Sequence, residues 1–138
     1  HKIESDVAYQ EIYTLAKFSI YVIDDYISVK TLQLLKICND NINIIVITDN
    51  KAKNNLNSDF INDFKNDTKL NISFKKNNDL FHDRYVVIDY NRKSEILYHC
   101  GHSSKDSGNS ICTIDRIEEK ELYKKSINKA LNNEDLKI

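Results

Sequence analysis

The chain has 138 residues, of which 41% are hydrophobic and 30% are charged, with a formal net charge of −1 at pH 7. This length and apolar content suffice for a core, so we expect a single domain over 1–138. The near-neutral charge argues against a broad nucleic-acid-binding face and leaves room only for a local basic cleft. The sequence contains neither a long apolar run nor a signal-peptide pattern, so we expect no membrane association.

Cysteine usage and the first residue bear on where the protein resides and what it belongs to. Cys38, Cys100 and Cys112 are scattered without a C-x-x-C pair, which disfavours a structural zinc site. An odd number of cysteines without a secretion signal fits a reducing compartment, so we expect a cytoplasmic protein. Because the chain starts at His1 rather than Met, we expect it to be a domain excised from a longer protein.

Helices and strands are predicted to alternate in the first half of the chain. Apolar residues at helical spacing after a Ser or Asp indicate helices, and short apolar runs between polar residues indicate strands. We expect helices over 5–17, 28–39 and 58–65, and strands over 18–23, 41–48 and 70–74.

The second half is predicted to form hairpins and a closing helix. We expect strands over 85–88, 95–100 and 110–114, turns at 91–94 and 101–106, and a helix over 118–132. The uninterrupted apolar run Tyr85–Ile88 is typical of a strand covered on both faces, so this strand should lie centrally. Together the elements predict an α/β fold with a mixed β-sheet flanked by helices.

A histidine and an arginine stand two residues apart where the chain enters the strand 85–88. Side chains two apart on a strand share a face, so His82 and Arg84 should point the same way and Asp83 the opposite way. An imidazole can attack a phosphorus atom or carry a proton, and a guanidinium grips an anion through two parallel hydrogen bonds. The pair therefore predicts a phosphate site.

Three acidic residues stand at strand ends. Asp24 and Asp25 follow the strand 18–23, and the carboxyl end of a strand faces the ligand crevice of an open α/β sheet. We expect one of them to line the site or to cap the turn that follows. Asp89 ends the strand 85–88, where it either contacts a site group or holds the turn after Tyr90.

The spacing of His82, Arg84 and Asp89 resembles the H-x-K-x-x-x-x-D signature of the phospholipase D superfamily, with Arg84 in place of Lys. Family members carry a Gly/Ser turn after the next strand, and 101–106 looks like its counterpart. Here His102 separates Gly101 from the serines, and Lys105 or Asp106 replaces an Asn. With 19–27 and 98–106, the chain resembles a phospholipase D-like C-terminal module of bacterial and phage proteins.

The resemblance implies a phospholipase D-like half-unit that performs metal-independent phosphodiester hydrolysis without a cofactor, and we expect a nuclease that acts on DNA or RNA. A single motif implies a homodimer in which the two His82 side chains face each other across a twofold axis. Catalysis would fall to His82, Arg84 and Asp89. The phosphate would be bound by Arg84, Ser103, Ser104 and Lys105, and the candidate lining residues are Asp24, Asp25, His102 and Asp106.

Two classes of function stay open. The first is the phosphodiesterase. The second is an inactive phospholipase D-like module that binds phosphate-bearing ligands or dimerises within a larger regulatory or phage-defence protein. The second stays open because Arg, which is bulkier and planar, stands where the family has Lys. A lipid phospholipase is disfavoured because no lipid-binding stretch is visible. A metal site made of His82, His99 and His102 is disfavoured because the family's chemistry needs no metal.

Overall fold

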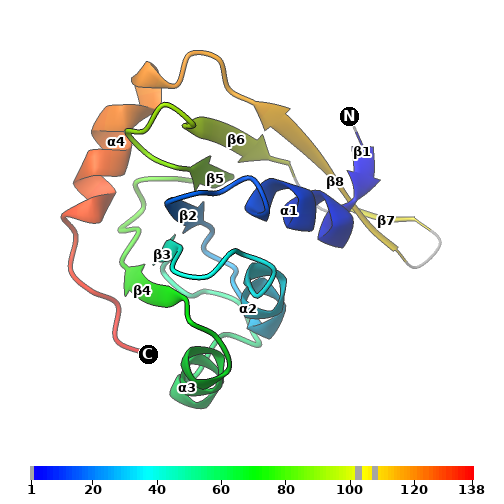
Figure 1. The fold of residues 1–138 in the computed structure, drawn as a ribbon, viewed down its shortest axis with the longest axis vertical. Coiled ribbons are helices and arrows are strands. Elements are labelled where there is room, and N and C mark those ends of the chain that lie inside the picture. Colours follow the sequence, from blue (N-terminus) through cyan, green and yellow to red (C-terminus); the bar gives the residue numbers. More distant parts are fainter. Residues whose placement is uncertain (1, 102–103, 107–108) are drawn as a thin grey trace.

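The computed structural model describes residues 2–101, 104–106 and 109–138, with the side chains of residues 2, 3, 104–106 and 109–111 left out. It is an α/β fold in which a mixed sheet is flanked by helices, as predicted (Figure 1). The strands are β1 Lys2–Glu4, β2 Ser19–Ile23, β3 Asn43–Ile47, β4 Asn71–Lys75, β5 Arg84–Ile88, β6 Ile96–Cys100, β7 Ser104–Asp106 and β8 Asn109–Arg116. The helices are α1 Ser5–Tyr13, α2 Val29–Leu35, α3 Ser58–Asp67 and α4 Glu121–Leu131.

The strand order places β5 in the middle of the sheet. The order is β1-β8-β6-β5-β2-β3-β4, and β7 pairs with β8. Strands β2, β3 and β4 run parallel, whereas β5 runs antiparallel to both β2 and β6. The expected central position of the strand 85–88 is therefore confirmed. Because Tyr85 pairs with Ile23, β5 begins at the same end of the sheet at which the parallel strands β2, β3 and β4 have their C-termini.

Helices cover both faces of the central part of the sheet, which explains why β2, β3 and β5 are apolar along most of their length. On one face, α1, α2 and α3 bury Ile12, Leu35 and Phe64 against every second residue of the strands. On the other face α4 buries Ile127 and Ala130. Figure 1 shows α4 on one side of the strands and α1 and α2 on the other. Each fully buried aliphatic side chain contributes about 1.5–3 kcal/mol, so this two-sided burial is the main source of stability.

The first helix is shorter than predicted. The sequence indicated a helix to residue 17, but α1 ends at Tyr13 with Thr14 as its C-cap. The backbone N–H groups of Lys17, Phe18 and Ser19 donate instead to the carboxylate of Asp89. Because these N–H groups are held by a residue 70 or more positions away, no local pattern could show that the helix stops early.

The second helix also ends before the predicted residue 39. Its regular part stops at Leu35, and the backbone N–H groups of Ile37 and Cys38 bond to carbonyls three residues back. Such bonds tighten the last turn into a 3₁₀ type, which is common at helix ends. The remaining helices differ from prediction by a few residues: α3 runs two residues further and α4 starts three residues later.

Two strands were not predicted, and both pair with β8. β1 and β7 have three residues each, and β7 occupies positions expected to form part of a turn over 101–106. β8 has eight residues, starts one residue earlier and ends two residues later than predicted, and so offers pairing sites to both. Short polar segments of this kind form strands because they pair with a neighbouring strand, and not because of an apolar pattern in their own sequence.

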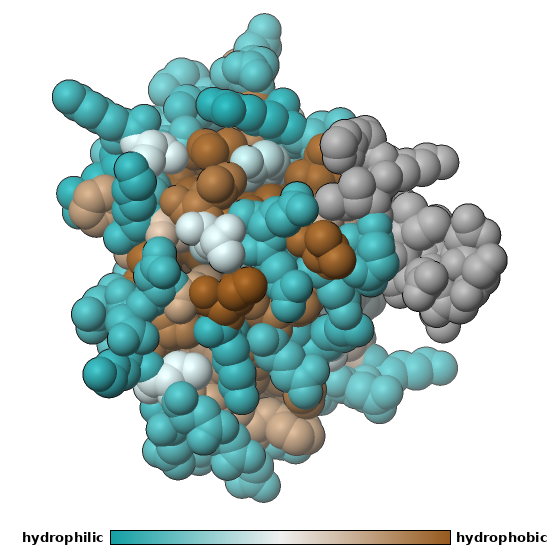
Figure 2. Space-filling view, turned by 45° about the vertical axis from the view of Figure 1, so that its right-hand side comes forward, coloured by the Kyte–Doolittle hydropathy of each residue, from teal (hydrophilic) through white to brown (hydrophobic). Residues whose placement is uncertain are grey.

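Hydrophilic side chains interrupt the apolar surface on the face that Figure 2 displays, where brown areas appear as separate patches. Leu122 and Tyr26 are the most exposed of the large hydrophobic residues described, at 73% and 67%. Within the described part of the chain, no helix has both the length and the apolar character needed to cross a bilayer.

Asp89 fastens the end of β5 to the start of β2. Its side chain is fully buried, and its oxygens accept hydrogen bonds from the N–H groups of Lys17, Phe18 and Ser19 at 2.7–3.1 Å and from the Ser94 hydroxyl at 2.6 Å. Burial alone would raise the pKa of Asp89, but these donors outweigh it, so the net shift is downward. Its backbone has φ 51°, a left-handed conformation that Asp tolerates.

We predict that Asp89→Asn lowers the free energy of unfolding by about 3 kcal/mol. The amide side chain has no negative charge, and its NH₂ group is a donor that cannot accept hydrogen bonds from the three backbone N–H groups around it. Since the pKa of Asp89 is lower in the folded state, its stabilisation is complete above the unfolded value of about 3.9 and is lost as the pH falls below it.

The measurement is urea unfolding of wild type and Asp89→Asn from pH 7 to pH 2.5. The difference between them should be largest above about pH 5 and should shrink in acid. The exposed Asp40→Asn is the matched control and should change stability by less than about 0.5 kcal/mol. A difference that stays constant across this pH range would contradict the assignment.

Candidate functional site

A cavity of about 260 Å³ opens where β5 begins and β6 ends. We call it the strand-end cavity. It is lined by Tyr26, His82, Asp83, Arg84, His99, Cys100 and Gly101. Its volume far exceeds the roughly 30 Å³ that one water molecule occupies in the liquid, so it has room for a polar group of a ligand.

His82 and Arg84 both line the strand-end cavity, so the two residues of the predicted phosphate pair lie at one site. His82 is exposed just before β5, and Arg84 is half-buried as the first residue of β5. The guanidinium donates one hydrogen bond to the carbonyl oxygen of Gly101 at 3.1 Å. Among the described residues, no carboxylate forms an ion pair with Arg84, and its one hydrogen bond leaves most of its five donors without a partner there.

Arg84 also borders a second cavity of about 210 Å³ between α1 and α2. Asp24 lines this second cavity, and its Oδ1 accepts a hydrogen bond from the N–H of Tyr26 at 2.8 Å. Burial raises the pKa of Asp24, against the lowering effects of the Tyr26 N–H and the Arg84 guanidinium. Asp24 thus caps a turn, and it lines the second cavity rather than the strand-end cavity that contains His82.

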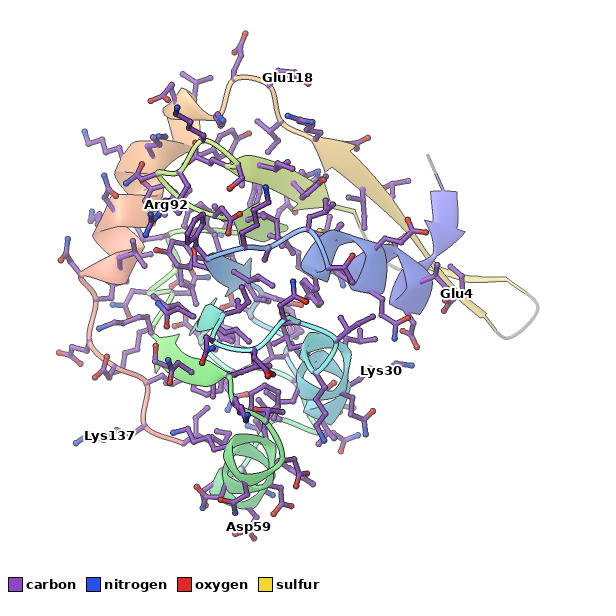
Figure 3. All side chains as sticks on the ribbon, viewed as in Figure 1. Glu4, Lys30, Asp59, Arg92, Glu118 and Lys137 are labelled. Atoms are coloured by element: carbon purple, nitrogen blue, oxygen red, sulfur yellow. The ribbon has the colours of Figure 1, made fainter. Side chains whose placement is uncertain are left out.

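The outer rim of the second cavity carries an ion pair between the helices. Lys30 of α2, labelled in Figure 3, lies 2.7 Å from the carboxylate of Asp6 of α1. This pair ties α1 to α2 at the surface, where such contacts contribute little stability. The other cationic residue that lines the second cavity is the half-buried Arg84, which also lines the strand-end cavity.

The Asp83 carboxylate contacts a histidine. Its Oδ2 lies 3.4 Å from Nε2 of His99, and both residues line the strand-end cavity. His99 stands opposite Tyr85 in the β5–β6 ladder, and the two rings lie 5.3 Å apart. A carboxylate on one side and an aromatic ring on the other therefore orient this imidazole.

A buried polar network shapes the loop that leads to His82. Asn77 is 1% exposed; its Oδ1 accepts from the N–H of Phe81 at 3.0 Å, and its Nδ2 donates to the Phe81 carbonyl at 2.9 Å and to Oδ1 of Asp25 at 3.0 Å. The carboxylate of Asp49 accepts from the N–H groups of three consecutive residues, 77–79. Asp25 thus supports the loop, and the structure does not place it in the strand-end cavity.

Asp89 lies at the other end of β5 from His82. The five residue steps from Arg84 span roughly 17 Å at about 3.4 Å per residue. Its oxygens are occupied by backbone N–H groups and by Ser94, so it contacts neither cavity. Of the two roles the sequence left open, the structure shows the one that holds the turn after Tyr90.

The segment 101–106 is only partly described. The N–H of Gly101 donates to the carbonyl of Thr113 at 2.7 Å, and a side chain at this glycine would collide with the Thr113 hydroxyl. His102 and Ser103 lie outside the described residues. Ser104, Lys105 and Asp106 form β7, and their side chains are not described, so the predicted phosphate contacts of this segment stay predictions.

The cysteines near the site are poor nucleophiles. Burial raises the pKa of the Cys100 thiol to about 12, so it stays protonated near neutral pH. Among the described side chains, no three His, Cys, Asp or Glu residues come together as a set of metal ligands. The side chains of the strand-end cavity that suit an anion are the imidazoles of His82 and His99 and the guanidinium of Arg84, beside the hydroxyl of Tyr26 and the carboxylate of Asp83.

Comparisons with known proteins yield no relative: no family model, no curated protein and no solved structure matches this chain significantly.

The sequence pointed to His82 and Arg84 but not to their supports. Asn77 and Asp49 looked like ordinary loop residues, although an Asn-rich, Pro-free connection of this kind often holds left-handed backbone, as Asn78 and Asp79 do here. His99 was visible only as a strand histidine, because its contact with Asp83 depends on the β5–β6 register.

We predict that Asn77→Ala lowers the free energy of unfolding by about 2–3 kcal/mol, because it leaves the buried N–H and carbonyl of Phe81 without partners. The matched control is Asn66→Ala, at an exposed position of α3, which should be neutral or slightly stabilising. Urea unfolding gives the free energies, and backbone amide shifts of residues 81–84 report the loop. Unchanged amide shifts in Asn77→Ala would contradict the proposed support of His82.

Proposed function

We propose that the protein is a metal-independent phosphodiesterase, specifically a nuclease, in which His82 attacks or protonates the phosphodiester and Arg84 holds it. The observation that carries the proposal is the half-buried Arg84 guanidinium, which lines one cavity together with an exposed imidazole and forms no ion pair with a described carboxylate. The likeness of 82–89 to the phospholipase D signature supports the same reading.

The two residues have complementary chemistry. Imidazoles titrate near neutral pH, so a histidine can act as a nucleophile or a proton donor there, whereas a guanidinium stays cationic. Arg84 therefore contributes binding and stabilises the charge of the five-coordinate transition state without transferring a proton. Its bond to the Gly101 carbonyl fixes the orientation of the guanidinium plane before a ligand arrives.

The chemistry of this superfamily uses two histidines, and one motif supplies only one of them. A homodimer that brings two His82 side chains together would provide the second, and we propose this assembly with a nucleic-acid substrate. The exposure of His82 at the end of the sheet is compatible with such a contact. Three buried, free thiols fit our placement of the protein in the cytoplasm.

A second candidate function is a module that binds phosphate-bearing ligands without turnover. The observation that favours it is the Arg84–Gly101 hydrogen bond, because a guanidinium already anchored to the backbone suits a fixed binding geometry. This module would keep the anion affinity of the strand-end cavity and lack hydrolysis.

We predict that His82→Ala abolishes hydrolysis of single-stranded DNA or RNA, because no other group can replace an attacking imidazole at that position. Arg84→Lys should lower kcat/KM by about tenfold, since one charge-assisted hydrogen bond is worth roughly 1.5 kcal/mol. The measurement is hydrolysis of DNA, RNA and a chromogenic diester, with and without EDTA.

The matched control is Arg92→Lys, because Arg92 stacks on the ring of Phe18 at 4.2 Å and is labelled in Figure 3 beside the β5–β6 connection, away from both cavities. It should leave turnover unchanged. Activity that EDTA removes, or that survives in His82→Ala, would overturn the mechanism. Phosphate binding that is lost in Arg84→Ala, in a protein without hydrolysis, would favour the binding module.

A further inference from the structure

The second cavity, which lies between α1 and α2, adjoins the strand-end cavity. Tyr26, Arg84 and Cys100 line both of them. The β5–β6 ladder pairs Arg84 with Cys100, so both side chains point to the face of the sheet that α1 and α2 cover. A phosphate group bound by Arg84 in the strand-end cavity is therefore next to the second cavity, which one of its two ester substituents can enter.

Aromatic and aliphatic side chains form much of the wall of the second cavity. Tyr9 and Tyr13 of α1 stack with their ring centroids 5.9 Å apart and 28° between the ring planes. The ring of Tyr26 is exposed at the boundary between the two cavities, where it can stack on a planar ligand. The volume of about 210 Å³ equals that of about seven water molecules at roughly 30 Å³ each, which is room for a purine ring.

One carboxylate in this cavity has acceptor capacity to spare. Among the described residues, the N–H of Tyr26 is the one hydrogen-bond donor to the side chain of Asp24, at 2.8 Å from Oδ1. Oδ2 and a second lone pair of Oδ1 can therefore accept hydrogen bonds from a ligand. The cavity thus offers two neighbouring acceptors beside aromatic rings.

The charges that line the second cavity oppose an anion inside it. Asp6 and Asp24 contribute two carboxylates, and Lys30 is already paired with Asp6 at 2.7 Å. Arg84 is the remaining cation of the lining, and it is the residue that we assign to the phosphate in the strand-end cavity. A neutral, planar group that donates hydrogen bonds therefore fits the second cavity better than a second phosphate group.

We propose that the second cavity is a nucleobase subsite that selects guanine in a nucleotide whose phosphate is bound by Arg84. Guanine presents two adjacent donors, N1–H and the N2 amino group, to the two oxygens of Asp24. Adenine, cytosine and uracil each place an acceptor beside their donor, and that acceptor would face the carboxylate. Bases of single-stranded nucleic acids are commonly read in this way, by hydrogen bonds to the Watson–Crick edge and by stacking on aromatic rings.

The inference rests on the proposed function and narrows its substrate class to single-stranded nucleic acid that contains guanine. A base can enter the cavity only when it is unpaired, because its Watson–Crick edge must be free to contact Asp24. Double-stranded substrates should accordingly be poor ones.

The first experiment measures kcat/KM for dinucleoside monophosphates that differ in one base, with the variable base on either side of the phosphate. On one of the two sides, guanine should exceed uracil by about tenfold or more, the discrimination expected of one bidentate contact to a base. Asp24→Asn keeps an oxygen for the Tyr26 N–H but replaces the other acceptor with a donor, so the guanine-to-uracil ratio should fall to within about twofold.

The matched control is Asp59→Asn, which removes an exposed carboxylate in the first turn of α3. This residue is labelled in Figure 3 and lines neither cavity. The variant should keep the guanine-to-uracil ratio of the wild type. A loss of the ratio in Asp59→Asn as large as that in Asp24→Asn would contradict the assignment of the contact to Asp24.

Calorimetric titrations test the subsite independently of turnover. Guanosine monophosphate, in its 3′ or its 5′ form, should bind the wild type about tenfold more tightly than the corresponding uridine monophosphate. Asp24→Asn should abolish that difference. Arg84→Ala should lose the binding of inorganic phosphate and keep that of guanosine, because the base contact does not use the guanidinium.

The possible outcomes separate the subsite from the catalytic proposal. Equal rates and affinities for the four bases, or a guanine preference that persists in Asp24→Asn, would overturn the inference. Hydrolysis without a base preference would remove the subsite and leave the proposed phosphodiesterase in place. Guanine-selective binding that is lost in Asp24→Asn, in a protein that hydrolyses no diester, would support the subsite and overturn the phosphodiesterase.

Discussion

The antiparallel pairing of β5 with β2 is the constraint on which the site depends. In the parallel part of the sheet, β2, β3 and β4 all end at one edge. A fourth parallel strand would begin at the opposite edge, but β5 runs the other way and begins beside the residue that ends β2. His82 and Arg84 therefore lie at the end of the sheet from which the loops after β2, β3 and β4 leave. At the far end of the same strand, the buried carboxylate of Asp89 fixes β5 to the first residues of β2.

The strands β2, β3 and β5, which are buried on both faces, were predicted to within two residues at each end, and β4, which is exposed on one face, was predicted from its alternation. The runs in β2, β3 and β5 are almost wholly apolar because helices cover both sides, and this pattern is visible without knowing any partner. β1 and β7 were not predicted because they have no apolar pattern of their own and form strands by pairing with β8. The early end of α1 escaped for a similar reason, since the N–H groups that would extend it bind Asp89, far away in sequence.

Prediction of the site followed the same division. Alternation along a strand predicted that His82 and Arg84 lie together, and both line one cavity, although β5 begins only at Arg84 and the intervening Asp83 lines the same cavity. The sequence did not decide between Asp24 and Asp25, because the direction of a side chain after a strand ends depends on its hydrogen bonds: Asp24 turns toward Tyr26 and a cavity, and Asp25 toward Asn77. His99 required the register of two strands, which the sequence does not contain.

The central claim is that the start of β5 is a phosphate site, and a crystal structure with orthovanadate tests it most directly. Vanadate adopts the five-coordinate geometry of the transition state of phosphoryl transfer. It should lie in the strand-end cavity, with a ring nitrogen of His82 either bonded to vanadium as an axial ligand or within about 2.7–3.2 Å of a vanadate oxygen, and with the Arg84 guanidinium within that hydrogen-bond distance of the vanadate oxygens. Vanadate bound at any other place on the chain, with His82 and Arg84 free of it, would contradict the account.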